Sequence, residues 1–215
     1  RYVFIEVTSQ GVVQHRHRFI DWDVAGVTNL HREHIESHGS FENYKQAKLD
    51  FFRYLTKSKK KDKYFFVNKD EELIDFERVA RSVVGAEVSI TSGDDVRKLV
   101  GESEFFEAEF NLVNAGLVVA FARSQGVSDE VISKVLSGFL GVPGRVQFVQ
   151  REPFSVVVDY AHTPDSLRKL LSFLKESEIP NPKSQIPKLK AVKVVEPAVL
   201  IRQVPPKATL VVDVT

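Results

Sequence analysis

The residues with the clearest chemical potential follow an apolar run that ends at Val158. Asp159 and His162 come directly after that run, and a helix start follows at Thr163 and Pro164. Thr163 is a suitable N-cap, and Pro164 suits the first helical position because its missing N–H would be unpaired there. Ligands of open α/β sheets collect beyond the carboxyl ends of strands, so we expect Asp159 and His162 to contribute to a site. The alternative is an ordinary polar strand-to-helix loop.

A second group of candidate ligands lies between residues 28 and 40, after one predicted strand and before a helix capped by Ser40. It contains three histidines and two glutamates, and Glu6 stands at the end of an earlier apolar run. Their spacing does not match the H-E-x-x-H zinc signature, and the absence of cysteine argues against a closed structural zinc site. A hard cation held by one or two protein groups and phosphate oxygens fits better. A surface loop that is merely rich in histidine is the alternative.

Lys48 is the exception in the helix predicted over residues 41–55. The apolar stripe of that helix consists of Phe41, Tyr44, Phe51, Phe52 and Leu55. Lys48 takes the position that completes the stripe, and a lysine on a buried face must snorkel, find a counter-charge or lose its proton. A neutral amine near a metal can also take up carbon dioxide and become a carbamate, which is an anionic oxygen ligand. The helix pattern leaves snorkelling and carbamate formation open.

Amide and guanidinium groups add candidates for a nucleotide site. Asn111 and Asn114 lie one turn apart at the start of an apolar helix, where they could bond a purine edge or Asn111 could be the N-cap. Arg145 precedes Asp159 by 14 positions, so one strand-turn-strand unit could bring the two to one crevice. A guanidinium suits phosphate, and a carboxylate suits a ribose hydroxyl.

The elements that must position these residues alternate along the chain, which predicts an α/β fold with a mostly parallel sheet flanked by helices. We predict strands at residues 3–7, 24–28, 64–67, 87–90 and 154–158, an edge strand at 104–110, and helices at 41–55, 71–84, 111–123, 128–139 and from 164 onward.

Three regions follow from this pattern. The turn Gly141-Val142-Pro143-Gly144 separates a first domain, residues 1–144, from the start of a second, Rossmann-like α/β domain, residues 145–178. Residues 179–215 are interrupted by prolines, and we expect an irregular tail that is aberrant or disordered, although short strands are possible there.

Composition sets limits on function. With 215 residues, 43% of them hydrophobic, the chain can bury a sizeable core. The net charge of +1 gives no support to a general nucleic-acid or membrane role, and the basic run Lys57–Lys63 is interpreted as a solvated loop. The absence of cysteine excludes disulfides and agrees with a cytoplasmic location. The chain has no methionine and starts at Arg1 inside a predicted strand, so we expect a piece of a longer protein.

Taken in order, the motifs resemble those of the Mur ligases, and most closely the MurE type, the UDP-N-acetylmuramoyl-tripeptide synthetases. The resemblance spans residues 1–176 and rests on these segments: Phe4-Ile5-Glu6-Val7-Thr8-Ser9, Gln14-His15-Arg16, Thr28-Asn29-Leu30, Arg32-Glu33-His34, His38-Gly39, Tyr44, Lys48, Phe110-Asn111, Asn114, Pro143-Gly144-Arg145 and Asp159-Tyr160-Ala161-His162-Thr163-Pro164-Asp165.

This resemblance implies an ATP-dependent ligase of peptidoglycan biosynthesis that joins an amino acid to a UDP-MurNAc-peptide through an acyl phosphate. It implies ATP and Mg²⁺ as cofactors, a cytoplasmic monomer, no nucleic-acid or membrane partner, and a fragment that is inactive alone. Carried over by motif, the metal ligands and catalytic residues would be Glu6, His34 and a carbamylated Lys48. The UDP-MurNAc-peptide would be held by Thr8, Ser9, Gln14 and Arg16, and ATP by Asn111, Asn114, Arg145, Asp159 and His162.

The chain departs from the family pattern at several points. Gln10 stands where the MurE pattern usually has His, and Thr8 replaces a usual Ser. The sequence has no G-x-x-G-K-[ST] phosphate loop and no D-N-P-R selector, so the amino acid that is added stays open. A frameshift before residue 193 is one hypothesis for the tail. The alternative functions are another Mur-superfamily ligase, of the cyanophycin or folylpolyglutamate synthetase kind, and a degenerate non-catalytic nucleotide-binding module.

Overall fold

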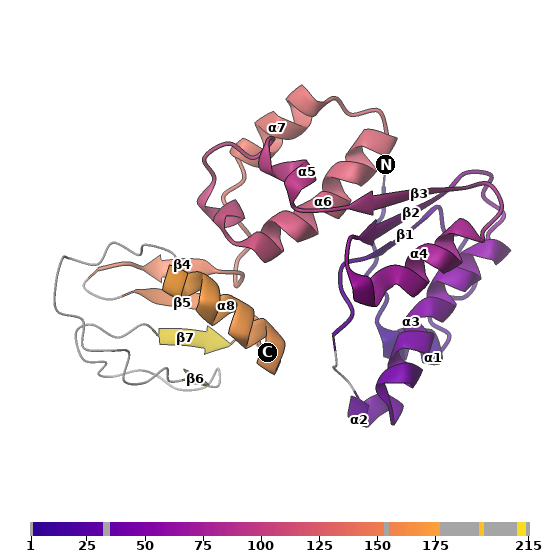
Figure 1. Ribbon diagram of the computed structural model, residues 1–215, viewed down its shortest axis with the longest axis horizontal. Coiled ribbons are helices and arrows are strands. Elements are labelled where there is room, and N and C mark those ends of the chain that lie inside the picture. Colours follow the sequence, from indigo (N-terminus) through magenta and orange to yellow (C-terminus); the bar gives the residue numbers. More distant parts are fainter. Residues whose placement is uncertain (1, 32–34, 153–154, 177–193, 196–209, 214–215) are drawn as a thin grey trace. The chain divides into compact units, whose positions relative to one another are not determined.

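The computed structural model describes residues 2–31, 35–152, 155–176, 194–195 and 210–213 (Figure 1). The chain divides into two compact units. The first comprises residues 1–102 and 109–138, and the second comprises residues 103–108 and 139–215. Within the described ranges, no helix is long and apolar enough to cross a membrane.

A three-stranded parallel sheet is the framework of the first unit. Its strands are β1 (Val24–Val27), β2 (Lys63–Asn68) and β3 (Ala86–Thr91), and they lie side by side in that order with their arrows pointing the same way (Figure 1). Ala25 pairs with Phe65, and Phe65 pairs with Val88. Because the strands are parallel, their carboxyl ends meet at one edge of the sheet.

Helices cover both faces of this sheet. The helices of the first unit are α1 (Ser9–Val13), α2 (Ile35–His38), α3 (Phe41–Tyr54), α4 (Ile74–Arg81), α5 (Asp94–Arg97), α6 (Glu109–Ser124) and α7 (Asp129–Ser137), and short 3₁₀ helices span Leu55–Lys57 and Glu71–Leu73. On one face, Phe52 of α3 contacts Phe65 of β2 and Phe76 of α4, at ring-centroid distances of 5.3 and 5.1 Å. On the other face, Phe66 contacts Phe121 of α6 at 6.2 Å. The alternation of side chains along β2 therefore separates two apolar layers.

The second unit is built on a mixed sheet of order β4-β5-β7-β6. Its elements are a 3₁₀ helix at Glu104–Glu107, β4 (Gln147–Gln150), β5 (Val156–Asp159), α8 (Pro164–Glu176), β6 (Val194–Val195) and β7 (Leu210–Asp213). β4 and β5 are antiparallel, whereas β5 and β7 are parallel. Val157 of β5 is fully buried and packs with Leu170 and Leu174 of α8.

The predicted start of α8 is confirmed in detail. Thr163 Oγ1 accepts a hydrogen bond from Ser166 N at 3.2 Å, and Ser166 Oγ accepts one from Thr163 N at 3.0 Å. This reciprocal pair is a capping box with serine in the place of the usual glutamate, and Pro164 is the first helical residue as expected.

Two predictions of secondary structure are wrong, and one capping alternative is excluded. Residues 2–8 contain no strand, since none of the described strands pairs with them, and Val3 and Phe4 are 84% and 77% exposed. Residues 104–107 form a 3₁₀ helix instead of an edge strand, with Phe106 N donating to Ser103 O at 3.0 Å. Helix α6 begins at Glu109, so Asn111 is not its N-cap.

Most of the predicted tail, residues 179–215, lies outside the described residues. The six that are described form β6 and β7, which add two short parallel strands beside β5.

His17 is a buried titratable group in the connection between α1 and β1. It is 6% exposed, its ring lies edge-on to Tyr54 at 4.6 Å and to Phe51 at 6.1 Å, and its Nδ1 has no hydrogen-bond partner. Burial lowers the pKa of His17, the charges of Arg18, His15 and Lys57 lower it further, and Asp50 opposes this shift. The folded chain therefore holds His17 neutral at a pH where an exposed histidine takes up a proton.

We expect the free energy of unfolding to decrease as the pH falls below about 6.5, the ordinary pKa of histidine. In that range the unfolded chain binds a proton at His17 and the folded chain does not, so acid favours unfolding, by about 1.4 kcal/mol for each unit of pKa difference. Trp22 is the only tryptophan and its Nε1 donates to His17 O at 2.9 Å, so its fluorescence in urea reports the transition. His17→Phe should reduce this pH dependence, and His15→Gln should retain most of it. An unchanged slope in His17→Phe would contradict the assignment.

Candidate functional site

Asn68 connects the carboxyl ends of all three strands of the first unit. Its Nδ2 donates to the carbonyl of Thr28, directly after β1, at 2.6 Å, and its Oδ1 accepts from Thr91 Oγ1, at the end of β3, at 2.6 Å. Asn68 and Thr91 are 2% and 3% exposed. A buried amide with both ends bonded fixes the edge from which the loop after Thr28 departs. Sequence reasoning missed this pair, although an asparagine that ends an apolar strand was the available signal.

Four side chains from three helices lie next to one another on the same unit. Ser9, the first residue of α1, has its Oγ 3.0 Å from His38 Nε2, at the end of α2. The His38 ring lies 5.6 Å from the ring of Tyr44 on α3, and Lys48 Nζ lies 5.2 Å from the Tyr44 ring centroid. The structure thus brings the predicted substrate residue Ser9 into the same cluster as Lys48. His38, one of the three histidines of the candidate ligand segment, and Tyr44 of the apolar stripe connect the two.

Lys48 is half-buried on α3, as its place in the apolar stripe predicts. Its position over the Tyr44 ring is a cation–π contact, which stabilises the ammonium form. Snorkelling and carbamate formation at Lys48 both stay predictions.

The predicted metal ligands are only partly described. Glu6 is exposed in the irregular segment of residues 2–8, and His34 lies outside the described residues together with Arg32 and Glu33. Among the residues that are described, no three His, Asp or Glu side chains gather into a metal site. The ligand set Glu6, His34 and Lys48 is therefore untested.

The other predicted substrate residues surround α1 and are exposed. Thr8 is the N-cap of α1 and its Oγ1 accepts from Gly11 N at 3.0 Å. Gln14 is the C-cap, and Arg16 N donates to Gly11 O at 2.8 Å. The backbone of this turn is held by its own hydrogen bonds, which leaves the Gln14 and Arg16 side chains at the surface.

In the second unit, Asp159 is a buried carboxylate bonded to the backbone. It is 7% exposed at the end of β5, and its oxygens accept from Val146 N at 2.8 Å and Ala161 N at 2.7 Å. Val146 has φ of 46°, which a β-branched residue rarely adopts. The carboxylate thus stabilises an unfavourable turn beside Arg145 as well as the loop after β5.

Arg145 and His162 meet around Tyr160. The Arg145 guanidinium carbon lies 4.6 Å from the Tyr160 ring centroid, and the His162 ring lies 4.9 Å from it at 77°. His162 Nδ1 is 2.9 Å from the carbonyl oxygen of Tyr160. Arg145 and His162 are both exposed, so the end of β5 presents a cation, an imidazole and an aromatic ring next to Asp159.

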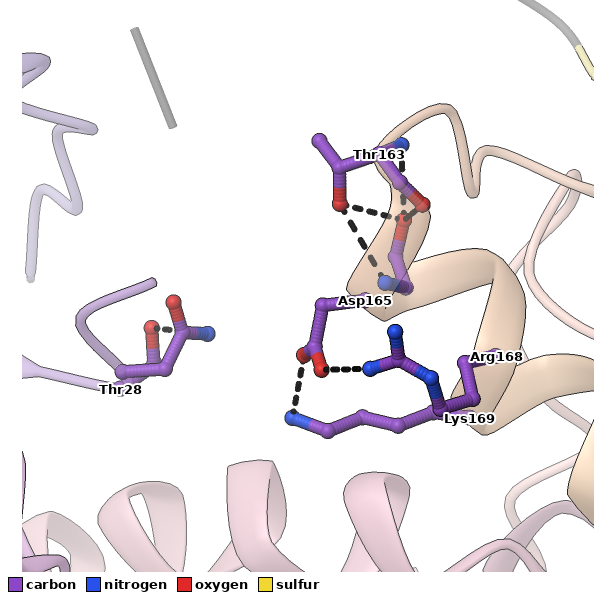
Figure 2. Close-up of polar contacts among 7 residues, drawn as sticks. Thr28, Thr163, Asp165, Arg168 and Lys169 are labelled. Carbon is purple, nitrogen blue, oxygen red and sulfur yellow. Dashed lines mark hydrogen bonds and ion pairs between the residues drawn. The ribbon is translucent and has the colours of Figure 1, made fainter. Parts of the chain in front are cut away.

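The first turn of α8 continues this polar surface. Figure 2 shows Asp165 between two cations, with Arg168 Nη1 at 3.3 Å and Lys169 Nζ at 3.1 Å from its carboxylate oxygens. An acidic residue in the first turn also interacts favourably with the helix dipole. Asp165 therefore stabilises the helix start and orients two basic side chains.

Asn111 and Asn114 are both on α6 of the first unit, and they differ in exposure. Asn111 is 7% exposed, whereas Asn114 is exposed. Only the Asn114 amide is thus presented to solvent. A cavity of about 350 Å³ between β3 and α6 lies on the same unit, but none of the predicted site residues lines it.

We expect Asp159→Asn to destabilise the end of β5. Asparagine has only one side-chain oxygen, so its NH₂ group would face one of the two backbone N–H groups that the carboxylate now accepts from. Hydrogen bonds to a charged group are worth about 1.5–3 kcal/mol each, so the amides of Val146 and Ala161 should exchange with solvent at least about tenfold faster. Hydrogen exchange followed by NMR measures this directly. Asp62→Asn, in an exposed loop of the first unit, is the control. Unchanged exchange at both amides would mean that the carboxylate does not hold this turn.

Family comparisons match both halves of the chain. The Mur ligase middle domain matches residues 1–131, and the Mur ligase glutamate ligase domain matches residues 144–186.

Curated relatives give the same result. A UDP-N-acetylmuramoyl-L-alanyl-D-glutamate–2,6-diaminopimelate ligase of Syntrophomonas wolfei is 30% identical over 195 residues, which is 81% of this chain and 40% of the relative. The Bacillus cereus enzyme of the same name is 32% identical over 80% of this chain and 40% of its own length. A Staphylococcus aureus UDP-N-acetylmuramoyl-L-alanyl-D-glutamate–L-lysine ligase is 29% identical over 78% of this chain and 38% of its own length. The chain thus spans about 40% of the length of these relatives.

Among solved structures, MurF from Acinetobacter baumannii superposes with a TM-score of 0.56 over 72% of this chain and 38% of that protein, at 22% identity. This likeness confirms the predicted α/β fold with a parallel sheet between helices.

Proposed function

Because the chain belongs to the Mur ligase family, we propose that it is part of an ATP-dependent ligase that joins an amino acid to a UDP-N-acetylmuramoyl-peptide. The observation that carries this proposal is the match to two Mur ligase domains in sequence, together with relatives of about 30% identity over four-fifths of the chain. The names of those relatives support a MurE-type substrate, the UDP-MurNAc-dipeptide, with diaminopimelate or lysine as the incoming amino acid. A cytoplasmic location and a monomeric state stay predictions.

The proposed reaction has two steps. The terminal carboxylate of the peptide attacks the γ-phosphorus of ATP, the bond from that phosphorus to the bridging oxygen breaks, and ADP leaves. The amine of the incoming amino acid then attacks the acyl carbon, loses a proton and displaces phosphate. Both steps need groups that position and neutralise the transferred phosphoryl group.

The residues at the end of β5 fit the ATP role. Arg145 has a guanidinium that is exposed and oriented by the Tyr160 ring, which suits two phosphate oxygens. Asp159 uses one acceptor position on each oxygen for a backbone N–H and keeps others for a ribose hydroxyl. His162 lies beside Tyr160 with its Nε2 available for a further polar contact. Asn114 would contact the adenine.

The residues proposed for magnesium fit the ion in chemical type. Glu6 supplies a carboxylate and His34 an imidazole, and a carbamate on Lys48 would supply a second anionic oxygen, which is what a hard cation prefers. To form it, the Lys48 ammonium group loses a proton and its neutral nitrogen attacks the carbon of CO₂, so that one C=O π bond opens and its electrons move to oxygen. The nitrogen then loses a second proton to solvent, which leaves a neutral N–H and a negative charge on the carbamate oxygens. The ion, when bound, stabilises the charge on the phosphoryl group. Ser9, in contact with His38 beside Lys48, would face the UDP-MurNAc-peptide with Thr8, Gln14 and Arg16.

Replacing Lys48 tests the carbamate. In the protein encoded by the gene that contains this chain, Lys48→Ala should reduce amino-acid-dependent ADP release by about 100-fold or more, in line with the loss of a ligand's supporting charge. A short carboxylic acid such as acetate should partly restore the rate, because it replaces the carbamate oxygens. Lys45→Ala is the matched control on α3, since Lys45 pairs with Asp75 at 2.5 Å. Turnover of Lys48→Ala at the rate of the unmodified protein would refute the carbamate role of Lys48.

Replacing Arg145 tests the ATP contact. We expect Arg145→Ala to raise the KM for ATP by about tenfold or more, since one charge-assisted contact to phosphate is worth about 1.5–3 kcal/mol. The KM for the UDP-MurNAc-dipeptide should change little. Arg151→Ala is the control, because Arg151 also stacks on a ring, that of Phe148 at 3.9 Å, and pairs with Glu104. Equal effects of the two substitutions would place Arg145 outside the nucleotide site.

A further inference from the structure

Two loops at the amino ends of β1 and β2 are joined into one surface. Ser58 Oγ donates to Trp22 O at 2.8 Å, and Lys59 N donates to Asp21 Oδ1 at 3.1 Å. Lys60 Nζ lies 3.2 Å from Asp23 Oδ1. These contacts hold residues 58–60 against residues 21–23, so the two loops lie side by side.

Phe19 is the most exposed aromatic side chain of this surface. Its side chain is 100% exposed, and its φ of 67° lies in a region that a bulky residue rarely adopts. The backbone N–H of Phe19 donates to Tyr54 Oη at 3.1 Å, which stabilises this conformation. The adjacent Ile20 is 40% exposed. The fold thus maintains an unfavourable turn that places a large apolar ring in water, and such a feature indicates a binding role.

Cations surround this apolar pair. Arg18 precedes Phe19, and the segment from Lys57 to Lys63 contains five lysines and one aspartate. We define the basic tip as six exposed residues of these two loops: Arg18, Phe19, Ile20, Lys57, Lys59 and Lys61. The net charge of +1 for the whole chain conceals this local excess. The sequence-based statement that the charge gives no support to a general membrane role rested on that average.

We propose that the basic tip docks on the surface of an anionic lipid bilayer. Clustered lysine and arginine side chains are attracted to anionic headgroups, and an aromatic ring gains by entering the boundary between headgroups and acyl chains. Both components are present here on one surface. A single-stranded nucleic acid is a poorer match, because such sites combine a basic groove with several stacking rings, whereas the tip offers one ring that stands out from the surface.

Docking through the basic tip does not depend on the proposed function. Tyr54, which holds Phe19, ends α3, and Tyr44 of the Lys48 cluster is ten residues earlier on the same helix. At 1.5 Å per residue the two positions are about 15 Å apart along the helix axis. The tip is also at the amino ends of the strands, opposite the edge that Asn68 organises. Substitutions in the tip should therefore leave ligase activity unchanged, which separates the two proposals experimentally.

Vesicle binding by the 215-residue chain tests the proposal. We expect the chain to sediment with phosphatidylglycerol vesicles and not with phosphatidylcholine vesicles, and less so at high salt. Phe19→Ser should weaken the partition coefficient about tenfold, and Phe19→Leu should weaken it less. Each of Lys57→Glu, Lys59→Glu and Lys61→Glu should weaken it by at least about fivefold, the effect of one cation near an anionic surface. Trp22 fluorescence should be quenched by brominated phosphatidylglycerol.

Matched controls come from the same chain. Leu140 is also 100% exposed, and Lys98 is exposed on the first unit, so Leu140→Ser and Lys98→Glu should bind as the unmodified chain does. Circular dichroism of each variant checks that the fold is kept. Equal binding to neutral vesicles, or equal loss in Leu140→Ser and Phe19→Ser, would overturn the proposal. Binding to a single-stranded RNA but not to vesicles would also overturn it and would assign the tip to nucleic acid.

Discussion

The structure of the first unit depends on one buried amide, that of Asn68. A parallel sheet leaves the ends of its strands without ladder partners, and here the Asn68 side chain bonds to the carbonyl after β1 and to the hydroxyl at the end of β3. Loss of either contact would leave a buried polar group unpaired, which costs more than the hydrogen bond gains. The segments that follow β1 and β3 start from positions that these bonds fix. After β1, Leu30 packs in the core at 2% exposure, and after β3 the chain continues from Thr91 into α5 and α6.

Asp159 has the corresponding structural role in the second unit, and its side chain is a charged carboxylate instead of an amide. Its carboxylate bonds to the N–H of Val146 on one side and of Ala161 on the other, so the turn before β4 and the loop after β5 depend on the same group. The bonds also fix Arg145 next to Val146 and Tyr160 next to Ala161, which places the guanidinium over the ring. These backbone bonds give Asp159 a structural role in its motif whether or not it also contacts a nucleotide. The nucleotide-binding role proposed for Asp159 must therefore be tested separately from its role in holding the loop.

Hydrophobic periodicity predicted the helices and strands whose sequence signals are local. The apolar stripe of α3, the N-cap at Thr163 and the short runs of β1, β2 and β5 are local patterns, and the structure confirms each of them. Residues 3–7 have an equally strong strand composition, but a strand also requires a neighbour, and none of the described strands pairs with them. The same limit applies to the site. Asn68, Thr91, His38 and Tyr44 gain their roles from contacts between elements, which spacing along the chain does not encode.

Lys48 shows how far sequence, structure and proposed chemistry constrain one another. Its spacing predicted a lysine on a buried stripe, and the structure places it half-buried with its ammonium over Tyr44. An ordinary lysine must give up about 4–5 kcal/mol to become neutral at pH 7, and here the cation–π contact would be lost as well. A carbamate can therefore form only if the anionic oxygens gain more than this from a bound cation. Carbamate formation at Lys48 and metal binding must then be linked, so that each increases with the other and both decrease as the pH falls.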